Sequence, residues 1–433
     1  MFGSLGDPYT VYLSPEELEP FDKSVRGTFS GIGAEVDIHE NRLRIITPLE
    51  ESPAWKAGVL AGDIVLEIDG QSTEGLSIND CIKRLTGPVG TKVAIKVRHL
   101  TGEEAVITIT RAQINVQTVK GLRRDAQNQW DFLISPAQKI GYIRISQFTD
   151  TTAADFARAL ETLKEQQVRG LVIDVRFNPG GLLDQAISVV DHFLPESKRN
   201  VSIKGRNVAE RVTTATGQGA WTELPIVVLV NEASASASEI LAGALQDNQR
   251  AMVIGARTFG KGSVQQVRPL ESGQGAIKIT NAYYYLPNGR NLQRKAEGDT
   301  WGVDASPFGY VPMTPEQNRS MIRIRRESDV LAPRQGQVMP ELTPDAIRSE
   351  LADAQLAAAV LALQGRLEQG RWPQVGQSLD AALVAETRRA ALQRQKDALL
   401  ERLNEIDGEL TRLQAPADAS APAVPPPATV PQP

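Results

Sequence analysis

Three serines in a run of small residues are the first candidates for chemistry. Ser234, Ser236 and Ser238 lie within residues 231–240, which follow the apolar run 225–230 and precede a predicted helix. Small residues allow a sharp backbone turn there, and a helix N-terminus offers free N–H groups and the positive end of its dipole. A serine that attacks a carbonyl group needs such donors to hold the oxyanion. Serines before Glu-Ile are equally typical of a helix cap, so both interpretations stay open at this point.

A lysine between two glycines is the second candidate. Lys261 lies within residues 257–265, just after the predicted strand 251–254. Burial lowers the pKa of a lysine by up to ~3–5 units, and the neutral amine can then act as a general base. If the chain after Lys261 is extended, Gln265 faces the same side and could orient the amine. The alternatives are a plain surface turn and a phosphate-binding glycine loop, although the Walker A spacing is absent.

A pair of glycines completes the set. Gly180 and Gly181 lie within residues 174–182, at a predicted strand-to-helix junction. Such a pair can present a backbone N–H to a neighbouring site. Ligands of parallel α/β sheets bind at the carboxyl ends of the strands. Because each of the three segments follows a strand, we expect them to meet at that edge of the sheet.

Histidine, cysteine and charge content exclude several other kinds of site. His39, His99 and His192 are the only histidines and none lies near a nucleophile motif, so a histidine triad or a histidine-rich metal site fits poorly. Cys81 is the only cysteine, which excludes an intrachain disulfide and argues against a thiolate metal site. A net charge of −5 argues against a general nucleic-acid binder. We find neither an apolar run of ~18 residues nor a signal peptide.

The apolar pattern predicts six segments along the chain. Residues 1–28 are a turn-rich lead, and 29–112 form a β-rich module with strands at 42–46, 64–68, 92–97 and 105–109 and a helix at 77–85. From 113 to 325, strands alternate with longer helices, which predicts an α/β domain with a mainly parallel sheet. Its elements are strands at 140–145, 170–175, 225–230 and 251–254 and helices at 153–167, at 182–193 and from 238.

The C-terminal part is predicted to be helical and then disordered. Residues 326–385 read as a polar linker and one helix at 345–367. Residues 386–414 form a charged helix with Leu392, Leu399, Leu403, Ile406, Leu410 and Leu413 on a/d-like spacings. This spacing fits either a single packed helix or a coiled coil of about three heptads. The alanine/proline tail 415–433 is expected to be disordered.

Taken together, these motifs resemble the carboxyl-terminal processing (tail-specific) serine protease family. Residues 178–181, 234–240 and 259–265 match its motifs in the family's order, within a resemblance that runs from about Leu5 to Gly289. The resemblance implies a crotonase-like α/β core, with Ser236 as nucleophile, Lys261 as general base and Gln265 orienting the lysine. It also implies an oxyanion hole formed by the N–H of Ala237 and of one glycine, either Gly180 or Gly181.

The β-rich module resembles the PDZ domain that such proteases carry. Residues 29–36 look like its carboxylate-binding loop, and the residues expected to bind a substrate tail are Gly31, Ile32, Gly33 and Ala34. Successive N–H groups of a glycine loop can hold a terminal carboxylate while an edge strand pairs with the peptide. The alternative is an ordinary glycine hairpin.

The resemblance implies an ATP-independent endopeptidase that cleaves proteins near their C-termini without a metal or cofactor. It further implies protein or peptide substrates with free C-termini, an activator or adaptor protein, a homo-oligomer, and a bacterial periplasmic or envelope location. The chain departs from the family in having Ala233 in place of glycine and a longer stretch at 294–315, and we expect it to lack its natural N-terminus. The alternatives are a catalytically silent PDZ scaffold that binds tails and a crotonase-type enzyme acting on acyl-CoA.

Overall fold

A computed structural model describes most of the chain. It covers residues 7–49, 51–125, 129–206, 208–219, 221–271, 273–295, 298, 300–330 and 341–378, and within the C-terminal stretch residues 388, 392–393, 395–400, 402–404 and 406–407. The chain divides into a large compact unit, Met1–Ser378, and a small one, Leu379–Pro433.

A mainly parallel sheet lies at the centre of the large unit. Its strand order is β10-β14-β15-β18-β19, with β13 paired to β14. Four of its strands, β14, β15, β18 and β19, are parallel, and they are buried on both faces because helices cover the sheet on both sides. The bounds of all six strands are β10 Val119–Lys120, β13 Leu133–Ser135, β14 Ile140–Ile145, β15 Gly170–Asp174, β18 Ile226–Val230 and β19 Ala251–Gly255. The four predicted strands are therefore confirmed.

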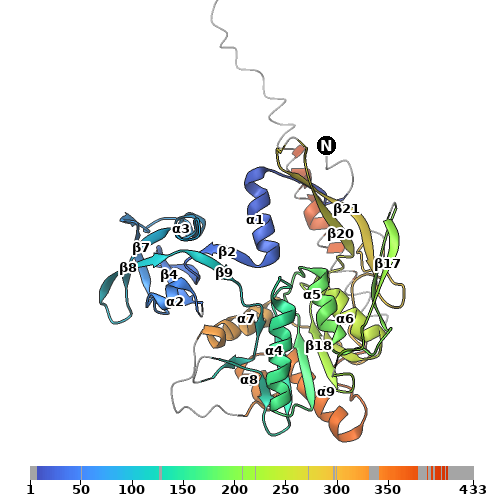
Figure 1. The fold of residues 1–433 in the computed structure, drawn as a ribbon. Helices are drawn as coiled ribbons and strands as arrows, with labels where there is room; N and C mark the ends of the chain where they lie inside the picture. Colours follow the sequence, from blue (N-terminus) through green and yellow to red (C-terminus); the bar gives the residue numbers. More distant parts are fainter. Residues whose placement is uncertain are drawn as a thin grey trace, which may run out of the picture. The chain divides into compact units, whose positions relative to one another are not determined.

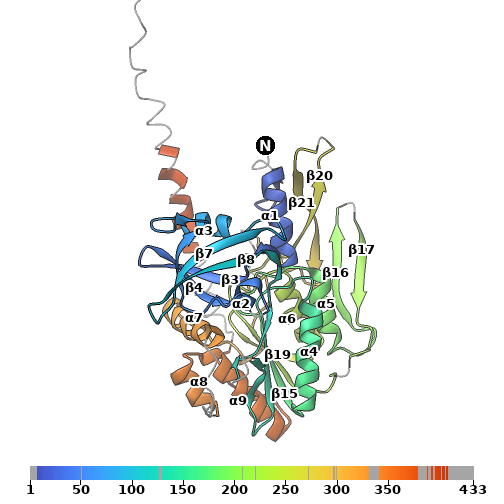
Figure 2. The same ribbon diagram turned by 60° about the vertical axis from the view of Figure 1, so that its left-hand side comes forward.

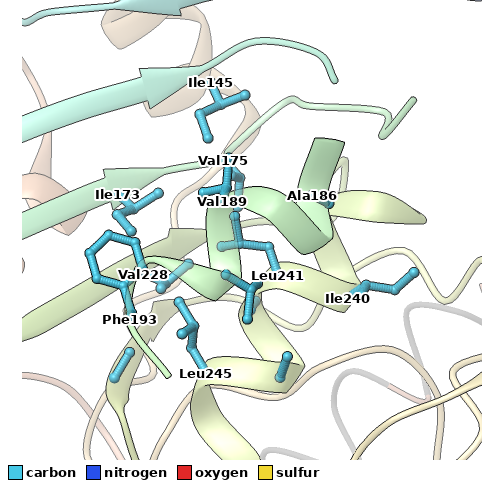
Figure 3. Packing of buried hydrophobic residues seen from close by; sticks show 14 of the residues in the cluster. Ile145, Ile173, Val175, Ala186, Val189, Phe193, Val228, Ile240, Leu241 and Leu245 are labelled. Carbon is cyan, nitrogen blue, oxygen red and sulfur yellow. The ribbon is translucent and has the colours of Figure 1, made fainter. Parts of the chain in front are cut away.

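Helices form a layer on each face of this sheet. Three helices, α4 (Thr152–Glu165), α5 (Leu183–Asp191) and α6 (Ala237–Asp247), share one hydrophobic cluster with the strands (Figure 1). Side chains such as Ile173 and Val228 from the sheet meet Val189 and Leu241 from α5 and α6 (Figure 3). The alternate strand residues face a second cluster built with α8 (Pro344–Glu350) and α9 (Ala354–Gln369). This alternation follows from the period of two along a strand.

A second, antiparallel sheet carries two long hairpins that the sequence pattern did not indicate. Its order is β1-β21-β16-β17, with β20 paired to β21, and both hairpins can be followed in Figure 2. The bounds are β1 Val11–Leu13, β16 Arg199–Gly205, β17 Val208–Thr214, β20 Ser263–Pro269 and β21 Ala276–Tyr285. The predicted turn-rich lead in fact contains β1 and a helix, α1 (Pro15–Arg26).

The PDZ-like module is an antiparallel sheet with two short helices. Its order is β3-β4-β5-β7-β8, with β6 beside β5, and its core includes the buried Cys81, whose thiol pKa is raised by burial. A two-stranded ribbon of β2 (Thr28–Gly31) and β9 (Ala112–Asn115) leads into and out of it. Its elements are β3 Ala34–His39, β4 Arg42–Pro48, α2 Pro53–Lys56, β5 Ile64–Ile68, β6 Gln71–Ser72, α3 Ile78–Leu85, β7 Lys92–Arg98 and β8 Glu104–Thr110.

The predicted single helix at 345–367 is wrong, because the structure has two helices there. The helix α8 ends at Glu350, and Ala352 has a left-handed backbone with φ 51°. Asp353 then caps α9 by accepting a hydrogen bond of 2.9 Å from the N–H of Leu356. Left-handed residues and Asp caps both interrupt a helix, but alanine-rich periodicity conceals such a break. The remaining elements are β11 Arg123–Arg124, β12 Trp130–Asp131 and α7 Pro315–Val330.

In the small unit, the described residues are helical. Leu392, Leu399, Leu403 and Ile406 are about half exposed, whereas Leu410, Leu413 and the tail 415–433 lie outside the described residues. Within the described part of the chain, no helix combines the length and apolar character needed to span a membrane.

Candidate active site

The three sequence motifs meet at the carboxyl ends of β15, β18 and β19, as expected. The N–H of Ala235 donates to the carbonyl of Asn178 at 3.0 Å, which joins the loop after β15 to the loop after β18. The N–H of Phe259 donates to the carbonyl of Ser234 at 3.0 Å, which joins the loop after β19 to the same segment. The parallel strands thus bring together the glycine pair, the serine turn, which follows ~55 residues later, and Lys261, a further ~25 residues along the chain.

The three serines differ in what their hydroxyl groups contact. Ser234 Oγ donates to the carbonyl of Val175 at 2.8 Å, and Ser238 Oγ donates to that of Asn178 at 3.0 Å; both residues are fully buried. Ser236 is half-buried and holds φ 56° and ψ −114° at the N-cap of α6. A non-glycine residue at positive φ is strained, and such strain persists where the surrounding structure imposes it. Ser236 is thus the least buried of the three serines, while Ser234 and Ser238 brace the turn with hydrogen bonds to backbone carbonyls.

A buried carboxylate joins the serine turn to the lysine loop. Glu239 Oε2 accepts the N–H groups of Ser236 at 2.7 Å and of Lys261 at 2.8 Å. Its Oε1 accepts the N–H of Gly260 at 2.7 Å and the hydroxyl of Thr258 at 2.5 Å. Burial raises the pKa of Glu239 above its usual value, although these four hydrogen bonds oppose the shift. The bond to Ser236 is the reciprocal half of a capping box, so one carboxylate both caps α6 and fixes the lysine loop.

The glycine pair lies directly against the serine turn. A side chain at Gly180, whose φ is +100°, would approach the Cβ of Ser236 to 2.8 Å, so only glycine fits there. The N–H of Gly180 is already donated to Asn178 Oδ1 at 2.8 Å. Among the described residues, the N–H groups of Gly181 and Ala237 have no hydrogen-bond acceptor. These two are therefore the backbone donors that remain available at the turn.

Lys261 is half-buried in the loop before β20. Burial first, and then the positive charge of Lys278, lower the pKa of Lys261, whereas Glu239 opposes this shift. A lowered pKa enlarges the fraction of neutral amine, which is the form that can accept a proton. In the described structure, Lys261 Nζ forms no hydrogen bond with Ser236 or with Gln265.

The condition for strand alternation between Lys261 and Gln265 is not met, because β20 begins only at Ser263. The register shift between Val264 and Gln265 places its extra residue, Asn281, on β21. The amide of Gln265 donates instead to Ser263 Oγ at 2.7 Å and reaches Thr280 Oγ1 at 3.5 Å.

A fully buried arginine connects the C-terminal helices to the glycine loop. Arg176 lies just before that loop, and its guanidinium donates to Asp174 at 2.7 Å and to Asp353 at 2.7 Å and 2.8 Å. Gln355 of α9 accepts a further bond at 3.1 Å, and Arg325 of α7 contacts both carboxylates. The two arginines hold the pKa of Asp353 below its usual value. The sequence contains no local signal for this cluster, since Asp353 lies 177 residues after Arg176.

The histidines play no part in this constellation. His99 Nδ1 lies 2.7 Å from Asp63 Oδ1 in the PDZ-like module, and His39 is exposed. His192 packs beside the rings of Phe156 and Phe193, and burial lowers its pKa, as expected for a packed histidine. Within the described residues, no group of three or more His, Cys, Asp or Glu side chains could hold a metal ion.

Comparison with known sequences assigns the chain to a family. Residues 139–304 match peptidase family S41, and residues 44–99 match the PDZ domain. The carboxy-terminal-processing protease of Bartonella bacilliformis is 35% identical over 85% of this chain and 82% of its own length. The carboxyl-terminal-processing protease of Synechocystis is 39% identical over 68% of this chain and 67% of its own length.

A solved structure, the photosystem II D1 C-terminal processing protease, is 29% identical, with a TM-score of 0.44 over 76% of this chain and 85% of that one. By its sequence relatives the protein is a serine-type endopeptidase with a PDZ domain. It belongs to the carboxy-terminal-processing proteases of peptidase family S41.

The first prediction concerns the carboxylate that joins the two loops. In Glu239→Gln, one acceptor oxygen becomes an NH₂ group that faces backbone donors, so we expect the free energy of unfolding to fall by about 3 kcal/mol. Cleavage activity should fall with it, because the serine turn and the lysine loop lose their common acceptor. Urea unfolding and a cleavage assay measure both effects. Glu232→Gln, an exposed change in the same turn, is the matched control; equal behaviour of the two variants would contradict this role.

The second prediction concerns the buried arginine. Asp353→Asn keeps an acceptor for the α9 cap but removes one charge partner of Arg176, so we expect a loss of about 3 kcal/mol in the free energy of unfolding. Because the folded-state pKa of Asp353 lies below the ordinary 3.8, its stabilisation is present above that pH and is lost on acidification. The difference in the free energy of unfolding between Asp353→Asn and wild type should therefore become smaller at acidic pH.

The control for Asp353→Asn is Asp345→Asn, whose carboxylate is 95% exposed in an ion pair with Arg348. A surface pair contributes about 0–1 kcal/mol. Urea unfolding at neutral and acidic pH distinguishes the two variants. A loss at Asp353 no greater than at Asp345 would show that Arg176 does not depend on α9.

Proposed function

We propose that the protein cleaves its protein substrates near their C-termini with Ser236 as nucleophile and Lys261 as general base. The observation that carries this assignment is the strained, half-buried Ser236 at a helix N-terminus, tied through Glu239 to the loop of Lys261. The other two serines of the motif support the same choice, because their hydroxyls are already bonded to backbone carbonyls.

The reaction follows from these groups. Neutral Lys261 takes the proton of Ser236 Oγ while the oxygen forms a bond to the scissile carbonyl carbon. The oxyanion is held by two backbone donors, for which we propose the N–H groups of Ala237 and Gly181, because the N–H of Gly180 is bonded to Asn178. The ammonium of Lys261 then protonates the leaving amine as the C–N bond breaks. Water then forms a bond to the ester carbonyl carbon while the same amine takes its proton. The ammonium returns that proton to Ser236 Oγ as the ester C–O bond breaks, and no step consumes ATP.

The absence of a Lys261–Ser236 hydrogen bond in the described structure supports a resting form in which the dyad is open. We propose that a substrate tail, an activator or an adaptor protein brings the two side chains together, with Gln265 then orienting the amine. The same observation favours the second candidate function, a scaffold that binds tails without cutting them. Catalytic hydrogen bonds commonly tighten only in the substrate complex, which favours the enzyme.

The PDZ-like module supports capture of substrate tails. Among the described residues, the N–H groups of Ile32 and Gly33 have no hydrogen-bond acceptor, and Gly33 has φ 75°. The loop from Gly31 to Ala34 leads directly into β3, which is an edge strand of the sheet. Free loop donors beside an open strand edge suit a peptide with a terminal carboxylate.

The remaining features of the family are proposals for this chain. The three-layer core is compatible with a crotonase-like fold. A homo-oligomer and an extracytoplasmic bacterial location follow from the resemblance, and the single cysteine, Cys81, is compatible with that location. We also propose that catalysis needs neither metal nor cofactor, since the chemistry above is supplied by side chains and backbone donors.

The third prediction tests the dyad. An unfolded protein with a free apolar C-terminus is incubated with wild type, Ser236→Ala and Lys261→Ala, and fragments are separated by mass. We expect both variants to lose cleavage by at least about 100-fold while still binding the tail. Ser188→Ala and Lys164→Ala, both exposed on neighbouring helices, should cleave normally. Undiminished cleavage by either dyad variant would refute the mechanism, and tail binding without cleavage by wild type would favour the scaffold.

The fourth prediction concerns pH. Since the charge of Lys278 lowers the pKa of Lys261, Lys278→Gln should raise it. The rising limb of the plot of kcat/KM against pH, which reports deprotonation of the general base in the free enzyme, should then move to higher pH. Lys204→Gln, on β16, is the control and should leave the limb in place. A limb that stays fixed or moves to lower pH in Lys278→Gln would argue against Lys261 as the titrating base.

A further inference from the structure

The N-terminal turn of the chain lies beside the proposed general base. The strand β1 pairs with β21, with Val11 opposite Lys278, and this pairing brings residues 7–10 to the lysine loop. The ring centroid of Tyr9 lies 5.2 Å from Lys261 Nζ. This is within the ~6 Å at which an ammonium interacts with the face of an aromatic ring.

Hydrogen bonds hold the turn in this place. Asp7 accepts the N–H of Tyr9 at 3.1 Å and the hydroxyl of Thr10 at 2.5 Å. Thr10 Oγ1 in turn accepts the N–H of Thr280 at 3.2 Å. Thr280 is the strand partner of Gln265, so the turn is linked to both residues proposed to work with Ser236. The arrangement is built from short-range bonds within the turn and one bond to β21, and it leaves the Tyr9 ring half-buried.

We propose that Tyr9 is a positioning residue of the protease reaction, which confines the amine of Lys261 against its ring and stabilises the ammonium formed when Lys261 takes the proton of Ser236. The proposal rests on the assignment of Lys261 as general base. It gives the N-terminal turn a place in the active site, although the turn lies more than two hundred residues before Ser236 and Lys261.

The charges around Lys261 explain why an aromatic ring such as that of Tyr9 suits this position. The groups that act on it are Tyr9 from the turn, Glu239 from α6 and Lys278 from β21. Glu239 is occupied by four hydrogen-bond donors, and Lys278 repels a second ammonium. An aromatic face attracts a cation more weakly than a carboxylate does, so it can stabilise the transient ammonium without keeping the lysine permanently protonated.

Two simpler explanations make different predictions. Tyr9 could be an apolar wall that merely excludes water from Lys261, or an anchor that holds β1 on the second sheet. An apolar wall is preserved when the ring is replaced by leucine, which is apolar and similar in length, whereas loss of an anchor lowers the unfolding midpoint without moving the pKa of Lys261. A cation-binding ring face is preserved by phenylalanine and lost with leucine.

The fifth prediction compares Tyr9→Phe and Tyr9→Leu in the full chain. Cleavage of a fluorescence-quenched peptide with a free apolar C-terminus is measured as kcat and KM across the pH range. We expect Tyr9→Phe to stay within about twofold of wild type, because the ring face is retained. In Tyr9→Leu, kcat should fall about tenfold with KM unchanged, and the rising limb should move to lower pH by about half a unit, since the ammonium loses its ring.

The control is Tyr12→Leu, which removes an exposed ring from β1, the strand that follows the turn of Tyr9. Tyr12→Leu should leave both kcat and the rising limb of the pH profile unchanged. The thermal unfolding midpoint of Tyr12→Leu should match that of Tyr9→Leu. Normal kcat and an unmoved limb in Tyr9→Leu would overturn the proposal, as would a Tyr9→Phe enzyme as slow as Tyr9→Leu. A fall in kcat accompanied by a lower unfolding midpoint, without a shift of the limb, would identify Tyr9 as an anchor instead.

Lys261→Ala in the same assay separates this inference from the proposed function. If Lys261→Ala still cleaves, the assignment of the base fails and the role of Tyr9 falls with it. If Lys261→Ala is inactive but Tyr9→Leu behaves as wild type in rate and pH profile, the dyad stands and only the inference about Tyr9 is overturned.

Discussion

The active-site geometry depends on one buried carboxylate. Glu239 accepts four hydrogen bonds from three loop residues and from the serine turn, so its two oxygens fix both segments in one frame. A carboxylate can do this only in ionised form, and burying that charge is costly unless every lone pair is used. The cost is offset by the donors that the helix N-terminus and the lysine loop leave free. That shared acceptor is one of the contacts that impose the positive φ of Ser236.

The parallel sheet positions the remaining loops of the site, and a second buried charge cluster, around Arg176, stabilises the loop after β15. The parallel strands place the three loops at one edge, while hydrophobic helices on both faces hold the strands in register. Arg176 then links the end of β15 to α9 through Asp174 and Asp353. A fully buried guanidinium is tolerated because its donors meet carboxylates in fork geometry. The C-terminal helices are therefore part of the support of the glycine loop, although they lie outside the matched peptidase segment.

The sequence predicted the parts of this design that are periodic or local. Continuous apolar runs indicated the central strands, and small residues after them indicated sharp turns with free donors. It failed where contacts are distant or where one residue breaks a pattern. The bulge at Asn281, the left-handed Ala352 and the meeting of Arg176 with Asp353 leave no periodic trace. Among Ser234, Ser236 and Ser238, spacing alone could not choose, because the difference lies in which hydroxyls meet buried carbonyls.

The environment of Lys261 suits the role of general base that we propose for it, in which a lysine serves where a histidine is more common. A general base must be neutral before the reaction and charged during it. Burial and Lys278 favour the neutral amine, while Glu239 opposes them and the Tyr9 ring faces the same nitrogen. A direct carboxylate partner would keep the amine protonated near neutral pH, and an entirely apolar pocket would make its protonation in the transition state expensive. A half-buried site that combines a repelling cation, a saturated carboxylate and an aromatic face lies between these limits, and that balance is what a lysine base requires.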